Sequence, residues 1–384
     1  IDITGTKLAR DGALSPAMGV FISSYILFPT GMLLTWKAIN DSSLINIDNI
    51  KTIFKKIRNK VEGKLRKTKI VYMGTPEFAV APLDALRKNG YNIAGIVTVA
   101  DKASGRGLKI NESAVKKYAV EHNIPVLQPV SLKDPEFLEA LKAWDADIFV
   151  VVAFRMLPKV VWEMPKLGTF NLHAALLPQY RGAAPINWAV INGEYITGVT
   201  TFMINEGIDT GHIMFRDQCR IEETDTAGDI HDKLMALGSN LVVQTVESII
   251  DKSVELRLQK SFIQGSEVLK PAPKLTRELC HIDWNGKTKD IYNLIRGLSP
   301  YPAAFTELTK EGKEPQQMKI FFGEKVTGDA FNALLAENGR DSAAPGEVLS
   351  DGRNYLAIST EDGAISITDL QLSGKKRMAV KDFL

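Results

Sequence analysis

Two hydrophobic periods alternate along the chain from about residue 68 onward. Short apolar runs predict buried strands, and segments with apolar residues three or four positions apart predict helices between them. The strands are expected at 68–74, 91–100 and 145–154, and the helices at 76–90, 112–123 and 135–144. Strands and helices of this length in alternation are typical of an α/β fold with a Rossmann-like, doubly wound, mostly parallel sheet.

The first strand-to-helix turn carries no dinucleotide signature. It reads "MGTPEFA" (73–79), which lacks the G-x-G-x-x-G spacing that binds a pyrophosphate, and the sequence has no Gly-rich P-loop. In open sheets of this class, ligands bind beyond the carboxyl ends of the strands. The sequence therefore indicates a site at that edge for a ligand other than a dinucleotide.

The pattern changes after a Pro- and Lys-bearing linker, which we place at 255–273. Residues 274–384 begin with helical periodicity and continue as short strands, such as 319–326, 355–360 and 364–372, separated by Gly and Asp turns. This pattern predicts a small OB-like β-barrel, a class that often binds nucleic acids. An oligomerisation or lid domain is the alternative at this point.

The front of the chain, residues 1–67, differs from the rest. From Gly12 to Trp36 it carries 25 consecutive uncharged residues, enough to cross a bilayer as one helix. Basic residues follow from Lys37, and the positive-inside tendency would place the downstream part in the cytoplasm. We expect a single transmembrane-like helix at 12–36, with a buried helix of a soluble protein as the alternative.

This front segment also resembles a known family. The stretch "ITGTKLARDGALSPAMGVFISSYILFPTGMLLTWKAINDSSLIN" (3–46) is similar to the C-terminal end of a lipopolysaccharide-export permease of the YjgP/YjgQ type. We interpret residues 1–67 as a permease remnant joined to an unrelated enzyme, through a gene fusion or a misassigned reading frame. Membrane attachment is expected only if this segment is retained.

Charge and cysteine usage narrow the functional class. The net charge of +2 is uneven, because residues 1–67 carry 11 Lys and Arg against 5 Asp and Glu, whereas residues 274–384 carry 15 against 16. Any nucleic-acid surface in the C-terminal part must therefore be a local basic patch. Two distant cysteines indicate a reduced, cytoplasmic interior, and five scattered histidines without metal-ligand spacing argue against a metal site.

Polar side chains occur at the ends of two expected strands. The segment 168–173 ("GTFNLH") carries Asn171 and His173 two positions apart, so both should project on one face and donate to one developing oxyanion. The loop 205–212 ("NEGIDTGH") carries Asp209 between two glycines, which we expect to bend the backbone and carry the carboxylate inward. Singly, each has an ordinary interpretation: a turn Asn, a core His, a solvated Asp. Together, without a nucleophilic Ser or Cys, they favour direct transfer between two bound substrates.

A long polar loop at 100–113 ("ADKASGRGLKINES") is a second candidate site. It holds Lys102, Arg106 and Lys109 around two glycines, a basic flexible segment suited to the phosphates of an acceptor stem. A surface loop without this role is the alternative. The basic residues that a binding face in the C-terminal part would have to gather are Lys287, Lys289, Arg296 and 375–377.

Two further stretches resemble a known enzyme family. They are "NLHAALLPQYRGAAPINWAVINGE" (171–194) and "GVTTFMINEGIDTGHIMF" (198–215). They are similar to the formyltransferases that use 10-formyltetrahydrofolate, and within them to the branch that acts on methionyl-tRNA. The resemblance covers about residues 68–384 and its motifs are highly specific. It implies a catalytic domain at 68–254 and a tRNA-binding domain at 274–384.

The resemblance also implies roles for individual residues. Asn171, His173 and Asp209 take the family's catalytic positions, and Arg106 takes that of its tRNA-contacting arginine. The turn that contacts folate in the family falls on Ala175, Leu176, Leu177 and Pro178. Ala175 stands where the family usually has Ser, which removes one hydroxyl.

The implied reaction moves a formyl group from 10-formyltetrahydrofolate, a co-substrate, to the amino group of methionine on initiator tRNA, without a metal. Asn171 and protonated His173 would stabilise the oxyanion, and Asp209 would keep His173 charged and help move the proton. We expect a cytoplasmic monomer. Two alternatives stay open: a formyltransferase for an amino sugar or small nucleotide, and a membrane-anchored nucleic-acid-binding module without catalysis.

Overall fold

The computed structural model describes residues 29–32, 67–104, 109–309, 312 and 314–384. The chain divides into two compact units, Ile1–Lys64 and Leu65–Leu384. In the first unit, residues 29–32 are helical, and the rest of the expected membrane helix at 12–36 lies outside the described residues. Within the described ranges, no helix is long and apolar enough to cross a membrane. The expected transmembrane-like helix therefore has no support in the structure.

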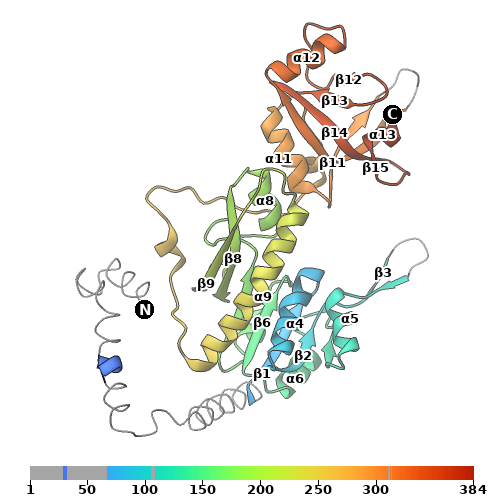
Figure 1. Cartoon of the computed structure of the whole chain (residues 1–384). Helices are drawn as coiled ribbons and strands as arrows, with labels where there is room; N and C mark the ends of the chain where they lie inside the picture. Colours follow the sequence, from blue (N-terminus) through green and yellow to red (C-terminus); the bar gives the residue numbers. More distant parts are fainter. Residues whose placement is uncertain (1–28, 33–66, 105–108, 310–311, 313) are drawn as a thin grey trace. The chain divides into compact units, whose positions relative to one another are not determined.

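A seven-stranded mixed sheet forms the centre of the first domain in the second unit (Figure 1). Its strand order is β5-β2-β1-β6-β7-β8-β9. The strands are β1 (Lys69–Gly74), β2 (Asn92–Val97), β5 (Val126–Leu127), β6 (Ile148–Val152), β7 (Thr169–His173), β8 (Ile196–Met203) and β9 (Ile213–Arg220). The pairs from β5 to β7 are parallel, and the two pairs that add β8 and β9 are antiparallel. The expected mostly parallel sheet is confirmed.

Alternate residues of β1 show why helices cover both faces of this sheet. Ile70 and Tyr72 belong to an apolar cluster that α4 and α9 complete, whereas Val71 and Met73 belong to another that α6 and α7 complete. Successive side chains of a strand point to opposite faces, so a continuous apolar run is buried on both. Figure 1 shows α4 and α9 side by side. The helices are α4 (Val80–Lys88), α5 (Ala114–Glu121), α6 (Pro135–Ala143), α7 (Lys159–Trp162), α8 (Pro185–Ile191) and α9 (Ala227–Asp251).

A second domain follows from about residue 274. Its strands are β10 (Ala304–Leu308), β11 (Gln316–Thr327), β12 (Val348–Ser350), β13 (Leu356–Ser359), β14 (Gly363–Leu372) and β15 (Met378–Ala379). Its helices are α10 (Arg277–Cys280), α11 (Thr288–Leu298), α12 (Asp329–Glu337) and α13 (Val380–Phe383). The strands pair antiparallel in the order β10-β11-β14-β13-β12, with β15 on β14. The antiparallel domain is confirmed. Its closure into an OB-like barrel stays a prediction, because in the described part the end strands β10 and β12 do not pair with each other.

The expected linker at 255–273 packs along the first domain. Arg257 forms an antiparallel bridge with Ile213, at the start of β9, and Ala272 forms a parallel bridge with Gly182. Ala272 is fully buried. Backbone hydrogen bonds of this kind fix the segment in place, so residues 255–273 are structurally part of the first domain.

Helix α11 packs against α8 and places one expected RNA-binding residue in the interior. The side-chain amide of Asn187 donates to the carbonyl of Gly297 at 2.8 Å, which ties the two helices together. Arg296 is only 5% exposed, and its guanidinium donates to the carbonyls of Glu222 and Asp225 at 3.2 and 3.0 Å. Burial lowers the pKa of Arg296. The position of Arg296 contradicts the expectation of an RNA contact, because the side chain is buried and its guanidinium already donates to backbone carbonyls.

Candidate active site

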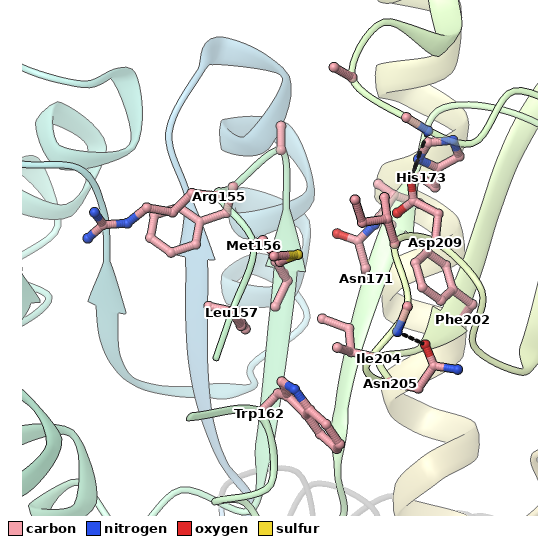
Figure 2. Close-up of a pocket in the computed structure, with 18 of the residues that line it drawn as sticks. Arg155, Met156, Leu157, Trp162, Asn171, His173, Phe202, Ile204, Asn205 and Asp209 are labelled. Atoms are coloured by element: carbon pink, nitrogen blue, oxygen red, sulfur yellow. Dashed lines mark hydrogen bonds and ion pairs between the residues drawn. The ribbon is translucent and has the colours of Figure 1, made fainter. Parts of the chain in front are cut away.

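A cavity of about 780 Å³ opens beyond the carboxyl ends of β6 and β7. Its lining comes mainly from residues 153–157 after β6, 171–174 at the end of β7, and 204–209 after β8. The site is expected at the carboxyl edge of the parallel strands, and this cavity lies there. Figure 2 shows Asn171, His173 and Asp209 along one side of it and Arg155, Met156 and Leu157 along the other.

Asn171 and His173 project from the same face of β7, as their spacing predicts. Both line the cavity, and the intervening Leu172 packs into the apolar cluster that contains α9. His173 is 6% exposed, and its Nε2 lies 2.8 Å from the carbonyl oxygen of Tyr180. A carbonyl can only accept, so this contact places a proton on Nε2. The nitrogen left to serve a substrate is therefore Nδ1.

Asp209 completes a polar group of three at this wall. Its Oδ2 lies 3.7 Å from Nδ1 of His173 and accepts the backbone N–H of Gly182 at 3.0 Å. The distance to Nδ1 is longer than a hydrogen bond, which leaves Nδ1 able to donate to a bound group beside the carboxylate. The three expected catalytic residues thus converge in the structure.

The loop that carries Asp209 bends for a different reason than expected. Asp209 itself takes a left-handed conformation, with φ 52°. Gly211 allows a close backbone approach, because a Cβ there would lie 1.6 Å from the carbonyl oxygen of Met203. The Oδ1 of Asn205 accepts from the Gly207 N–H and the Thr210 hydroxyl at 3.1 and 2.8 Å, which closes the loop on itself. The inward carboxylate is thus held by several local contacts.

The expected folate-contacting turn lies outside the lining of this cavity. None of Ala175, Leu176, Leu177 and Pro178 is among its lining residues. Ala175 and Leu177 are fully buried, and the hydroxyl of Thr200 on β8 donates to the Ala175 carbonyl at 2.6 Å and accepts the Leu177 N–H at 3.1 Å. Thr200 therefore engages two backbone groups of the turn, and the contact of the turn with folate stays a prediction.

The remaining walls are largely apolar. They include Phe154, Met156, Trp162 and Ile208, and Met156 and Ile208 are 73% and 64% exposed. Exposed apolar side chains around a cavity mark a surface that a ligand covers. The guanidinium of Arg155 donates to the carbonyls of Pro129 and Val130, and burial lowers its pKa. Arg155 thus braces one wall of the cavity.

The expected basic residues fall into three situations. Lys102 and Lys109 lie on the two strands of a hairpin, β3 (Lys102–Ser104) and β4 (Lys109–Asn111), and Arg106 lies outside the described residues. Lys287 and Lys289 are exposed at the start of α11. Arg296, as described above, is buried. In the described part of the chain, no group of three or more His, Cys, Asp or Glu residues could hold a metal ion.

Three residues that support the site were missed by sequence reasoning. The Tyr180 carbonyl holds His173, and both Arg181 and the loop of Asp209 are hydrogen-bonded to Gln259. Burial and a hydrogen bond to Glu194 raise the pKa of the Tyr180 phenol. Only the adjacency of Tyr180 and Arg181 to the "NLH" motif could have suggested them, and nothing local in the sequence marks Gln259.

Comparisons with known proteins agree with this geometry. The family described as "Formyl transferase" matches residues 67–246, and the one described as "Formyl transferase, C-terminal domain" matches residues 274–384. The chain belongs to the formyl transferase family. Neither match includes residues 1–66, so the permease origin of the front segment remains unsupported.

The chain is also similar to proteins with a more specific name. Methionyl-tRNA formyltransferase of Azobacteroides pseudotrichonymphae genomovar. CFP2 is 53% identical over 319 residues, which are 83% of this chain and 95% of that protein. Methionyl-tRNA formyltransferase of Bacteroides fragilis is 50% identical over 316 residues, 82% of this chain and 94% of that protein. A solved N-formyltransferase from Helicobacter canadensis, in complex with folinic acid and dTDP-3-aminofucose, has a TM-score of 0.55 at 21% identity and covers 81% of this chain and 100% of its own. The last similarity concerns the fold.

Proposed function

We propose that Asn171, His173 and Asp209 carry the transfer of a formyl group from 10-formyltetrahydrofolate to the amino group of methionine on initiator tRNA. Family membership and two relatives at about half identity support this reaction and this co-substrate. The observation that carries the residue roles is the convergence of an amide, an imidazole and a carboxylate in one cavity of about 780 Å³. Such a set can stabilise an oxyanion and move a proton.

The chemical step forms one bond and breaks another. The methionyl amine attacks the formyl carbon, negative charge develops on the formyl oxygen, and the bond from carbon to N10 of the folate then breaks. The Asn171 amide and Nδ1 of His173 donate to that oxygen. One amine proton is lost and one is gained by N10, so the reaction is balanced without an additional reactant.

Asp209 has two tasks in this proposal. Its carboxylate lies 3.7 Å from Nδ1 of His173 and helps to orient the imidazole for donation to the oxyanion. It can also take a proton from the attacking amine and pass it to N10, directly or through water. The Gly182 N–H holds Oδ2 in place for both tasks.

The apolar walls are suited to the ring systems of the folate. Phe154, Met156, Trp162, Ile204 and Ile208 line the cavity and would bury the pterin and aminobenzoyl groups. Apolar walls with a few convergent polar groups are the usual composition of a small-molecule site. Water exclusion here would also strengthen the hydrogen bonds to the developing oxyanion.

The tRNA would be held by basic residues in two regions. We propose the loop with Lys102, Arg106 and Lys109 for the acceptor stem, and exposed Lys287 and Lys289 for a second backbone contact. Because charged tRNA is a cytoplasmic substrate, we also propose that this part of the chain works in the cytoplasm.

The two alternatives are disfavoured. An amino-sugar substrate is supported only by distant structural similarity, which concerns the fold. A non-catalytic binding module has no use for a converged Asn, His and Asp, and it conflicts with membership of an enzyme family.

The test is a formylation assay with purified protein, 10-formyltetrahydrofolate and charged initiator tRNA, following folate release. Asp209→Asn should lower kcat by about 10²- to 10⁴-fold, the usual contribution of acid–base catalysis. The matched control is Asp217→Asn on β9, an exposed residue outside the cavity, which should keep normal kcat. Near-normal turnover by Asp209→Asn would refute the assigned roles, and folate release without tRNA would favour a small-amine substrate or hydrolysis.

A further inference from the structure

Gln259 is a buried side chain with every hydrogen-bonding position occupied. It begins the short helix η2 (Gln259–Phe262) within the segment 255–273 and is 5% exposed. Its Oε1 accepts from Nε and Nη2 of Arg181 at 3.0 and 2.6 Å. Its Nε2 donates to the carbonyls of Asp209 and Gly211 at 2.8 and 2.9 Å. An amide side chain has two acceptor sites and two donor hydrogens, so its capacity is filled.

The orientation of this amide is determined by its partners. Arg181 can only donate and the two carbonyls can only accept, so oxygen must face the guanidinium and nitrogen must face the loop. Gln259 therefore connects Arg181 to the Asp209 loop in one defined geometry. A carboxylate at this position could replace only the oxygen that accepts from Arg181, because it has no hydrogen to donate to the two carbonyls.

The two segments that Gln259 joins are the ones that hold the catalytic groups. Tyr180, just before Arg181, supplies the carbonyl that fixes His173. Gly182, just after it, supplies the N–H that binds Oδ2 of Asp209. The relative position of these segments sets the distance of 3.7 Å between Nδ1 and Oδ2.

The carbonyl that Gln259 binds belongs to a residue with a costly backbone conformation. Asp209 has φ 52°, which costs a non-glycine residue about 1–3 kcal/mol unless its surroundings hold it. The hydrogen bonds from Gln259 to the carbonyls of Asp209 and Gly211 supply such a constraint on both sides of the turn. Without them, the loop can relax and carry the carboxylate away from His173.

We propose that Gln259 is a positioning residue for formyl transfer, which holds the Asp209 carboxylate beside His173 by clamping the loop at 209–211 to Arg181. The inference rests on the roles proposed above for Asp209 and His173. It makes the segment between the two domains a working part of the active site, although Gln259 does not line the cavity.

The deciding variant is Gln259→Glu. It keeps the acceptor that faces Arg181 and replaces the donor group with an oxygen opposite two carbonyls. We expect kcat to fall about 10- to 100-fold, the scale of a catalytic group displaced by about 1 Å. KM for 10-formyltetrahydrofolate should stay within about threefold, because the apolar walls that would bind it are unchanged.

A double-mutant cycle separates positioning from general loss of structure. If Gln259 acts through Asp209, then Gln259→Glu should cost far less in an Asp209→Asn background than in the wild type. Equal losses in both backgrounds would overturn the proposal. If Asp209→Asn itself retains turnover, the catalytic role proposed for Asp209 is wrong. If Asp209→Asn is inactive and Gln259→Glu has a normal kcat, only the positioning role of Gln259 is wrong.

A second amide side chain with a similar set of hydrogen bonds serves as a control for loss of stability. Asn338, at the end of α12, also connects two segments through three hydrogen bonds, to Leu334, Tyr355 and Ser350. Asn338→Asp should lower the melting temperature without the loss of kcat expected for Gln259→Glu. If Gln259→Glu does not fold, Gln259→Met replaces it as the test, because methionine keeps the length of the side chain without a buried charge. We expect the same loss of kcat. A folded Gln259→Met with normal kcat would refute the proposal.

Discussion

Thr200→Val tests what holds the turn at 175–178 against the sheet. Thr200 is fully buried, and its hydroxyl bridges the Ala175 carbonyl and the Leu177 N–H at 2.6 and 3.1 Å. Valine has nearly the same shape, so the change removes the bridge without opening a large cavity. The Leu177 N–H also reaches the Ala175 carbonyl at 3.2 Å, so neither group is left without a partner and the change removes two hydrogen bonds of about 1 kcal/mol each. A methyl group buried in place of the hydroxyl offsets about 1 kcal/mol. The free energy of unfolding should therefore fall by about 1 kcal/mol.

The measurement is equilibrium unfolding in urea, with Thr200→Ser as the matched control. Serine keeps the hydroxyl and loses one methyl group, which should cost about 1 kcal/mol. The hydroxyl bridge predicts that the valine variant is less stable than the wild type, although it keeps both branches of the side chain. If Thr200→Val is as stable as the wild type or more so, while Thr200→Ser shows its expected loss, hydrogen bonding by Thr200 does not hold the turn.

Two further predictions concern the second domain. The backbone N–H and hydroxyl of Thr288 hydrogen-bond to Asp362 and lower the pKa of its carboxyl below the ordinary 3.8. Such a group stabilises the folded protein at a pH above the carboxyl's pKa in the unfolded chain, and this stability is lost as the pH falls through its pKa in the folded protein. The stability advantage of the wild type over Asp362→Asn, measured by thermal melts, should therefore shrink between about pH 5 and pH 2, and a constant difference would contradict the linkage. Lys287→Gln with Lys289→Gln should weaken tRNA binding and flatten its dependence on salt by about one to two charges. Arg296→Met should mainly lower the melting temperature, because Arg296 is buried and donates to the carbonyls of Glu222 and Asp225. Filter binding across a salt series separates the two; an unchanged salt slope in the lysine variant would exclude both lysines from the interface.

The cavity wall with Asn171 and His173 could be predicted because it depends on local geometry. Asn171 and His173 lie two apart on an extended segment, and a strand places such residues on one face whatever surrounds it. The carboxyl edge of a doubly wound sheet is likewise a property of the topology. Asp209 was found as a polar residue in a Gly-bearing loop, although the residue that adopts the left-handed conformation is Asp209 itself.

The sequence is less informative about residues whose environment is created by distant parts of the chain. Arg296 is expected on an RNA surface as one of the few basic residues of the C-terminal part, yet the packing of α11 near residues 222–225 buries it. Gln259 had no local signal, because its partners Arg181 and Asp209 are 78 and 50 positions away. The turn at 175–178 is expected to contact folate from the family resemblance alone, and its support by the hydroxyl of Thr200, on a strand about 25 residues later, has no signal in the turn itself.

Because residues 255–273 run along the first domain, the last strand of its sheet and the last residue that supports its site lie at different positions in the chain. A fragment that ends at residue 254 would contain Asn171, His173 and Asp209 and all the described strands of the large sheet. It would lack the partner of Gly182 at Ala272 and the side chain that clamps Asp209. The large sheet thus ends before residue 254, whereas the contacts that hold the proposed catalytic groups extend to residue 272. Any fragment or domain graft of this enzyme should therefore be cut after residue 273.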